Sequence, residues 1–119
     1  MSKLTRNIPF KENGNRKINK YTEQPFVVSF VKKLEKGYRF IDLAMSDLKN
    51  LQNFFDIASQ LTVYQMDKKY KRESNKNDIL YDEPVIHYGT SDSFRIHGIY
   101  IEGRFEVLRI DPNRKFHNK

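Results

Sequence analysis

The stretch that most constrains the fold runs from Phe94 to Asp111. Residues 94–101 and 104–111 are both rich in Ile, Val, Phe and Tyr, which favour β-strands. Between them stands Glu102-Gly103, and Gly103 can supply the positive φ that a tight hairpin turn requires. The sequence therefore predicts two antiparallel strands joined at this turn.

Alternation along the first of these strands changes at Gly98. Phe94 and Ile96 are at even-numbered positions, whereas Ile99 and Ile101 are at odd-numbered positions. A glycine at such a slip predicts a β-bulge, which would bring all four apolar residues onto one face. The other face would then carry Arg95, His97 and Tyr100.

The second strand has apolar residues at both odd and even positions, and therefore on both faces, which is typical of a central strand. Arg109 lies on it, and with Arg95 and His97 it defines a candidate polar site on the sheet. The alternative interpretation is that these three are ordinary solvent-facing residues of a half-buried sheet.

A chain of 119 residues fits one domain with a single core. We divide it into a flexible basic arm, residues 1–24, and a single α+β domain, residues 25–119. The arm has six Lys or Arg residues against two Glu, with Pro, Gly and Asn throughout. It could lie along a phosphate backbone, or it could be a solvated tail without a specific role.

The net charge of +7 and the pI of about 9.6 favour an anionic partner, with nucleic acid first and an acidic protein surface second. Cysteine is absent, which excludes disulfides and thiolate metal sites. No apolar run approaches the length of a membrane span, and no signal-peptide core opens the chain. We expect a cytoplasmic protein that binds no membrane and no cofactor.

The remaining segments complete the predicted fold. Two β-rich runs within residues 26–43 predict a first hairpin. Ser46 is expected to cap a helix from Asp47 to about Leu61, and Thr62 a second helix through Tyr70. Residues 85–88 predict a short strand before the central hairpin. The fold class is α+β, with an N-terminal β-hairpin, two helices and a C-terminal three-stranded antiparallel sheet.

The densest positive cluster lies where the second helix ends, at Lys68, Lys69, Tyr70, Lys71 and Arg72. Such a helix end could hold phosphates while its tyrosine stacks on a base. The alternative is a basic last turn of the kind that the helix dipole prefers. Two further residues complete the candidate nucleic-acid-binding set, Tyr100 and Lys115.

The residue types suit metal-independent RNA cleavage, which needs a base, an acid and cations around the developing phosphorane charge. His97 and His117 could be base and acid, with Arg95, Arg109 and Lys115 stabilising the charge. A metal site is not expected, because the three histidines have none of the short spacings that place ligands together on one element.

The order of helix pair, three-stranded sheet, strand arginine and basic tail resembles the RelE/ParE-type toxin superfamily. The resemblance lies in Phe94-Arg95-Ile96, residues 105–110 and residues 115–117. It implies ribosome-dependent mRNA cleavage without metal, with Arg95 as the arginine of the central strand. Lys115 and His117 would stand for the family's terminal basic or aromatic residues. The chain departs from the family at its front, where an arm and a hairpin replace a single strand.

Arg95-Ile96-His97-Gly98 followed by Asp111-Pro112-Asn113 also resembles the ending of small uncharacterised bacterial proteins associated with mobile elements. Those often read Asp-Pro-Asn-His, whereas Arg114 stands last here. The leading hypothesis is an RNA-binding, toxin-antitoxin type endoribonuclease that acts on RNA or the ribosome. The alternative is a non-catalytic interaction protein of a mobile element, a host-takeover or anti-defence factor that binds an acidic protein surface or nucleic acid.

Overall fold

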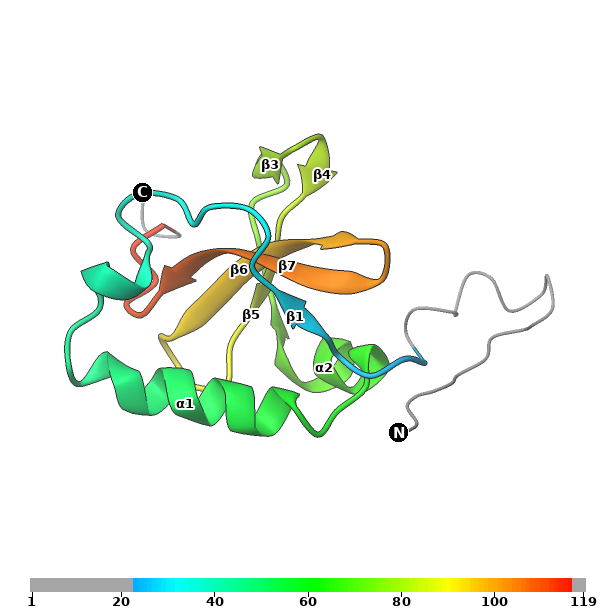
Figure 1. The fold of residues 1–119 in the computed structure, drawn as a ribbon, viewed down its shortest axis with the longest axis horizontal. Coiled ribbons are helices and arrows are strands. Elements are labelled where there is room, and N and C mark those ends of the chain that lie inside the picture. Colours follow the sequence, from blue (N-terminus) through cyan, green and yellow to red (C-terminus); the bar gives the residue numbers. More distant parts are fainter. Residues whose placement is uncertain (1–22, 117–119) are drawn as a thin grey trace, which may run out of the picture.

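The computed structural model describes residues 23–116, in which two helices lie against one face of a twisted five-stranded sheet (Figure 1). The strand order is β1-β7-β6-β5-β2. These strands are β1 (Val28–Ser29), β2 (Lys71–Arg72), β5 (Ile86–Tyr88), β6 (Arg95–Ile101) and β7 (Arg104–Asp111). A separate two-stranded ribbon is formed by β3 (Ile79–Leu80) and β4 (Glu83–Pro84).

The central hairpin is confirmed, since β6 and β7 pair in antiparallel fashion around Glu102-Gly103. Glu102 has φ of 51° and Gly103 has φ of 83°. Two successive residues with positive φ match the twist of a tight hairpin, and glycine adopts this conformation without steric cost.

A register shift between His97 and Gly98 confirms the irregularity at this glycine, but its extra residue is Leu108 on β7. A Cβ on Gly98 would lie 2.2 Å from the carbonyl oxygen of Glu106, so β7 can approach only a glycine here. Because β6 itself has no insertion, its side chains alternate without a break.

The predicted faces of β6 are therefore wrong beyond Gly98. Tyr100 packs with Phe94 and Ile96 against the helices, whereas Ile99 and Ile101 join a second cluster with Val85 and Leu108.

Both predicted helices are confirmed, as α1 (Asp47–Ala58) and α2 (Val63–Tyr70). Thr62 caps α2 by accepting a hydrogen bond from the Gln65 amide, and the Gln65 side chain accepts one from the Thr62 amide. Ser46 makes no capping hydrogen bond, and α1 ends three residues before Leu61.

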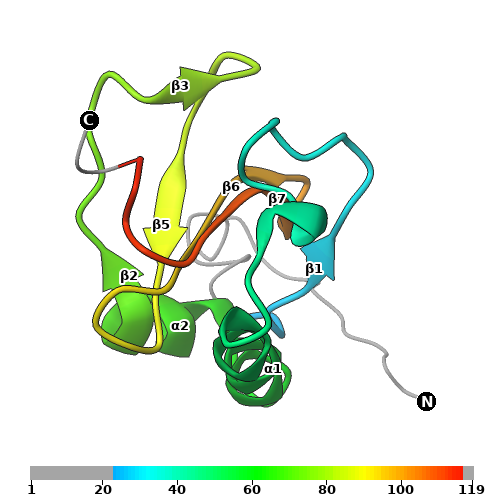
Figure 2. The ribbon, with the colours of Figure 1, turned by 90° about the vertical axis from the view of Figure 1, so that its left-hand side faces the viewer.

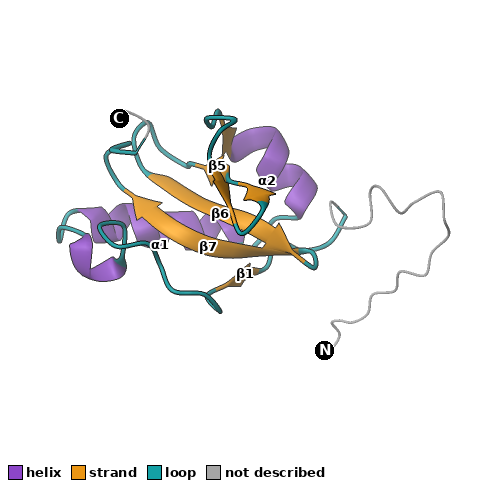
Figure 3. Cartoon of the chain, turned by 90° about the horizontal axis from the view of Figure 1, so that it is seen from above, coloured by secondary structure: helices purple, strands orange, loops and turns teal. Residues whose placement is uncertain are grey.

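The main core lies between the helices and the sheet. Figure 3 shows from above that the two helices lie behind the strands. Its buried residues are Phe26, Phe54, Ala58, Val63, Met66, Tyr88, Phe94, Ile96, Phe105, Val107 and Ile110.

The predicted N-terminal hairpin is wrong. Of residues 26–43, only β1 is a strand, and it pairs in parallel with β7, while Phe40–Asp42 is a 3-10 helix. The backbone of this segment forms local turns and also bonds to β7: the Glu35 amide donates to the Leu108 carbonyl, and the Ile110 amide donates to the Tyr38 carbonyl. β1 and β2 thus extend the predicted three-stranded sheet β5-β6-β7 to five strands.

Residues 30–43 continue along the edge of β7, and the β3–β4 ribbon lies on the side of the sheet away from the helices (Figures 1 and 2). The predicted basic arm, residues 1–24, falls almost entirely outside the described residues. In the described part of the chain, no helix has the length and apolar character needed to span a bilayer.

Candidate functional site

Arg109 is the centre of a buried polar network on the sheet face opposite the helices. Its Nη1 and Nη2 donate to the two carboxylate oxygens of Asp78, each at 2.9 Å, and its Nε donates to Glu35 at 2.8 Å. Arg109 is only 2% exposed. This bidentate contact orients the plane of the guanidinium and also pairs its charge with a carboxylate.

His87 and His97 stack directly beside this arginine. Their ring centroids are 3.6 Å apart and their planes differ by 5°. His97 Nδ1 lies 3.2 Å from Arg109 Nη1, and His87 Nε2 lies 3.2 Å from Asp78. Since a guanidinium can only donate, His97 Nδ1 is an acceptor in this contact.

The C-terminal segment closes over the network. The Asp111 carboxylate accepts hydrogen bonds from the amides of Lys115 and Phe116, both at 2.8 Å. These bonds hold the Phe116 ring over the Arg109 guanidinium, with the guanidinium carbon 3.8 Å from the ring centroid. The tail therefore shields the network from solvent.

The network sets the charge states of its members. Burial raises the pKa of Asp78, but hydrogen bonds from Arg109 and His87 outweigh it, so that the pKa lies below its ordinary value. Burial lowers the pKa of Arg109, and hydrogen bonds to Asp78 and Glu35 reverse the effect and raise it. Both groups remain ionised as a buried pair.

A pocket of about 180 Å³ opens at the edge of this network. Arg72 and Glu73 line it from β2 and the residue after it, and Arg95 from the start of β6. Arg114 lines it from the C-terminal segment, which passes close to β5 in Figure 2, and the buried His87 also lines it. Three arginines from three separate parts of the chain thus line one pocket.

Arg95 is held in place by its own loop. Its Nη1 donates to the Ser91 carbonyl at 2.7 Å and its Nη2 to the Asp92 carbonyl at 2.8 Å. A Cβ on Gly89 would lie 2.6 Å from Arg95 Nη1, so the glycine leaves room for the guanidinium.

The other two arginines each have an unusual local feature. Arg72 Nε is buried and has no hydrogen-bond partner among the described residues. A buried donor without an acceptor is costly. Arg114 has φ of 54°, a left-handed conformation that non-glycine residues rarely adopt.

The three arginines repel one another. The pKa of Arg95 is lowered, first by burial and then by the charges of Arg72 and Arg114. Asp92 and Asp111 act in the opposite direction, but neither lines the pocket. An anion in the pocket would relieve this repulsion.

The structure brings His97 and Arg109 together, as the sequence predicted, and buries them. The interpretation of the strand residues as solvent-facing is wrong for this pair, because His97 is 1% exposed. Arg95 lies in the adjacent pocket together with Arg72. His117 falls outside the described residues.

The other predicted nucleic-acid-binding residues are dispersed. Tyr70 packs against the main core, and the Tyr100 hydroxyl lies 2.6 Å from that of Tyr88 on the helix side of the sheet. Lys115 Nζ donates to the Gly37 carbonyl at 3.2 Å. All four lysines of the set are exposed, namely Lys68, Lys69, Lys71 and Lys115, and the first two occupy the last turn of α2.

Sequence reasoning missed Asp78, Glu35 and Arg114 as members of this site. Asp78 lies in a polar stretch that reads as a loop, and no local pattern pairs it with Arg109, 31 residues later. A signal did exist for Arg114, because the turn residues Asp111-Pro112-Asn113 before it reverse the chain back toward the sheet.

Comparison of the chain with known protein families, curated proteins and solved structures finds no match. The function must therefore be inferred from the site itself. Among residues 23–116, no group of three or more His, Cys, Asp or Glu side chains is placed to hold a metal ion.

Proposed function

We propose that the protein binds RNA, and that a phosphate group of the RNA occupies the pocket of Arg72, Arg95 and Arg114. The observation that carries this proposal is that three mutually repelling arginines line one pocket, with Glu73 as the one acidic residue among its lining residues. Phosphate matches a set of guanidinium donors in both charge and geometry. The net charge of +7 favours an extended polyanion over an isolated small anion.

Metal-independent cleavage stays a prediction. A catalytic base and acid must come within hydrogen-bond reach of the reacting atoms. Of the described histidines, His87 lines the pocket, while His97 is buried behind it and contacts Arg109. Incubating labelled single-stranded RNA with the protein in EDTA, with and without ribosomes, tests cleavage separately from binding.

The binding proposal is tested by fluorescence anisotropy with a labelled single-stranded RNA. Arg72→Gln, Arg95→Gln and Arg114→Gln should each weaken binding by about 10- to 100-fold, the range expected for lost hydrogen bonds to a charged group. Lys49→Gln, on the outer side of α1, removes the same charge away from the pocket and should change binding by less than about threefold.

Circular dichroism of each variant shows whether it is folded. Folded arginine variants that bind RNA as tightly as Lys49→Gln would contradict the proposal.

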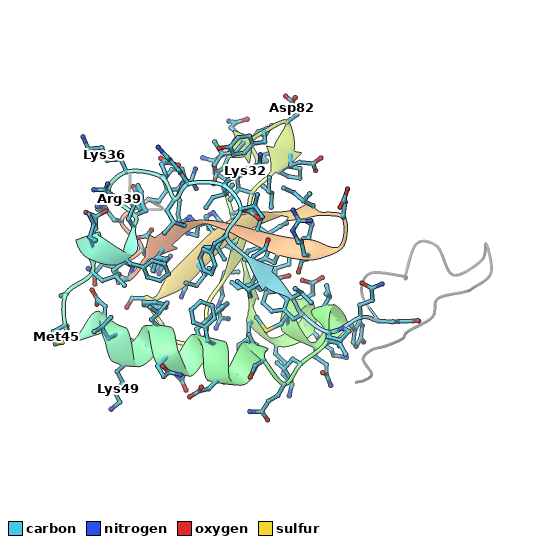
Figure 4. The ribbon with its side chains drawn as sticks, in the orientation of Figure 1. Lys32, Lys36, Arg39, Met45, Lys49 and Asp82 are labelled. Carbon is cyan, nitrogen blue, oxygen red and sulfur yellow. The ribbon has the colours of Figure 1, made fainter. Side chains whose placement is uncertain are left out.

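A second candidate function, docking of an acidic protein segment, is favoured by a groove of about 500 Å³ on residues 33–41. Leu34, Phe40 and Ile41 line it together with three basic residues, Lys33, Lys36 and Arg39. Ile41 is 77% exposed, and the neighbouring Met45 is 83% exposed. Figure 4 shows Lys36, Arg39, Met45 and Lys49 along the same side of the molecule.

An apolar groove with a basic rim fits an amphipathic segment with acidic side chains. The chain's own residues 1–22 are basic, so charge disfavours them as the occupant. A fluorescent amphipathic peptide of Glu and Leu should bind the protein, and Ile41→Asp should abolish this binding while RNA binding persists. A peptide affinity unchanged by Ile41→Asp would exclude this site.

A further inference from the structure

We infer that the pocket of Arg72, Arg95 and Arg114 takes a terminal phosphate, that is, a phosphomonoester at one end of an RNA chain. This inference rests on the RNA binding proposed above and specifies which phosphate is bound. Three properties of the pocket carry it, namely its size, its charge and its donor set.

The pocket is large enough for a phosphate group and too small for a nucleotide. Its volume is about 180 Å³, below the range of about 300 to 1,000 Å³ that holds small-molecule ligands. His87, only 2% exposed, lines it as well, so the pocket reaches from the surface to a buried side chain. A chain end can project one phosphate into such a space, whereas an internal phosphate must leave room for the chain on both sides.

The charge of the lining residues matches a doubly charged phosphate better than a singly charged one. Three arginines and Glu73 line the pocket, and three positive charges less one negative charge leave a net charge of +2. A phosphomonoester carries about −1.5 to −2 at pH 7, with a second pKa near 6. A phosphodiester within an RNA chain carries about −1.

The donors point to the same ligand. Arg95 uses both terminal nitrogens on the carbonyls of its own loop, so its guanidinium is pre-positioned and contributes charge as well as its remaining N–H groups. Arg72 and Arg114 line the same pocket beside it. A terminal phosphate offers three acceptor oxygens, one more than a phosphodiester has free of the chain.

Three short RNAs of identical sequence and internal label test this inference. One has a 5′-phosphate, one a 3′-phosphate, and one has hydroxyl groups at both ends. At least one phosphorylated RNA should bind about tenfold or more tightly than the hydroxyl-ended RNA, because the terminal phosphate makes extra charge-assisted hydrogen bonds. The comparison also shows which end is recognised.

Two further measurements separate a pocket effect from a general charge effect. Arg114→Gln should remove the preference for phosphorylated RNA, whereas Lys49→Gln should retain it. Lowering the pH from 7.5 to 5.5 should also reduce the preference, because the terminal phosphate loses its second negative charge over this range.

The two proposals fail in different ways. If the three RNAs bind equally and all are weakened by Arg72→Gln, the terminal-phosphate inference is overturned while RNA binding stands. If folded protein binds none of the RNAs, both are overturned. Equal preference in wild type and Arg114→Gln would place end recognition elsewhere on the protein and overturn the inference.

Discussion

Arg109 is a charged side chain that the fold buries almost completely. Its bidentate contact with Asp78 and its bond to Glu35 satisfy the guanidinium, and the Phe116 ring covers it. Buried ion pairs of this kind contribute less by their attraction than they cost when one partner is removed. The pair therefore fixes the arrangement of the segments that meet there, which include residues 30–43 and the tail.

Replacing Arg109 by Gln should destabilise the protein strongly. The change leaves Asp78 buried and unpaired, which typically costs about 3 to 5 kcal/mol. Urea unfolding followed by circular dichroism measures this loss. The double variant Arg109→Met with Asp78→Leu removes both charges and should recover much of the stability. A loss below about 1 kcal/mol in the single variant would show that the ion pair is not buried as described.

Acid should destabilise the protein through Asp78. Its pKa is lower in the folded state than the value of about 4 expected in the unfolded chain. The ionised carboxylate therefore stabilises the fold above about pH 4, and this stabilisation is lost as the pH falls through the folded-state pKa. Urea unfolding at several pH values between about 6 and 2.5 should show a smaller acid-induced loss for Asp78→Asn than for wild type. Parallel pH profiles would contradict this assignment.

The β6–β7 hairpin shows what local sequence predicts well. Its turn, its two strands and the irregularity at Gly98 are all visible from residue type and spacing. The sequence does not show which of the two strands holds the extra residue. Both strands are apolar near Gly98, and only the close approach of the Glu106 carbonyl to this glycine decides it. For the same reason, the prediction of which β6 side chains share a face is wrong beyond Gly98.

The first hairpin was predicted from β-propensity within residues 26–43, and propensity cannot say which partner a strand will find. The edge of β7 offers hydrogen bonds to this segment, including Phe105 to Val27 and Ile110 to Tyr38. These contacts join residues more than 70 positions apart, so no local pattern records them. The buried network around Arg109 was unpredictable in the same way, although His97 and Arg109 lie on the two strands that the sequence predicts.

Gly98→Ala should test the close approach of the two strands. A methyl group would lie 2.2 Å from the Glu106 carbonyl oxygen and 2.8 Å from the Phe105 ring, so β7 must shift. Overpacking of this kind usually costs about 1 to 3 kcal/mol. Thermal unfolding should show a lower Tm for this variant, while Ser93→Ala, at an exposed loop position, should leave it nearly unchanged. An unaltered Tm for Gly98→Ala would mean that the strands are farther apart.

The sheet divides the molecule into two chemically different sides. The helices cover one face with an apolar core, while the opposite face holds the buried ions and the arginine pocket beside them. The buried ion pair and the proposed binding pocket thus lie next to each other. Asp111 and Arg109 hold the tail, and Arg114 belongs to that tail. RNA binding and the stability of the tail should be coupled by this proximity.

The strength of RNA binding should depend steeply on salt. Each phosphate of a single strand that the protein neutralises contributes a slope of about −0.7 in a plot of log affinity against log salt concentration. Arg95→Gln should make the slope shallower by up to about 0.7 for each phosphate contact that it removes. Anisotropy titrations at several salt concentrations measure both slopes, and Lys49→Gln is the control. Identical slopes for Arg95→Gln and wild type would show that Arg95 does not contact RNA phosphates.

The most direct measurement is a titration of the ¹⁵N-labelled protein with single-stranded RNA, followed through the arginine Nε–Hε signals. The Arg72 signal should shift and saturate with the RNA, together with those of Arg95 and Arg114. The signal of the buried Arg109 should stay nearly constant. Saturation with RNA while the Arg72 signal remains unchanged would contradict phosphate binding in the arginine pocket.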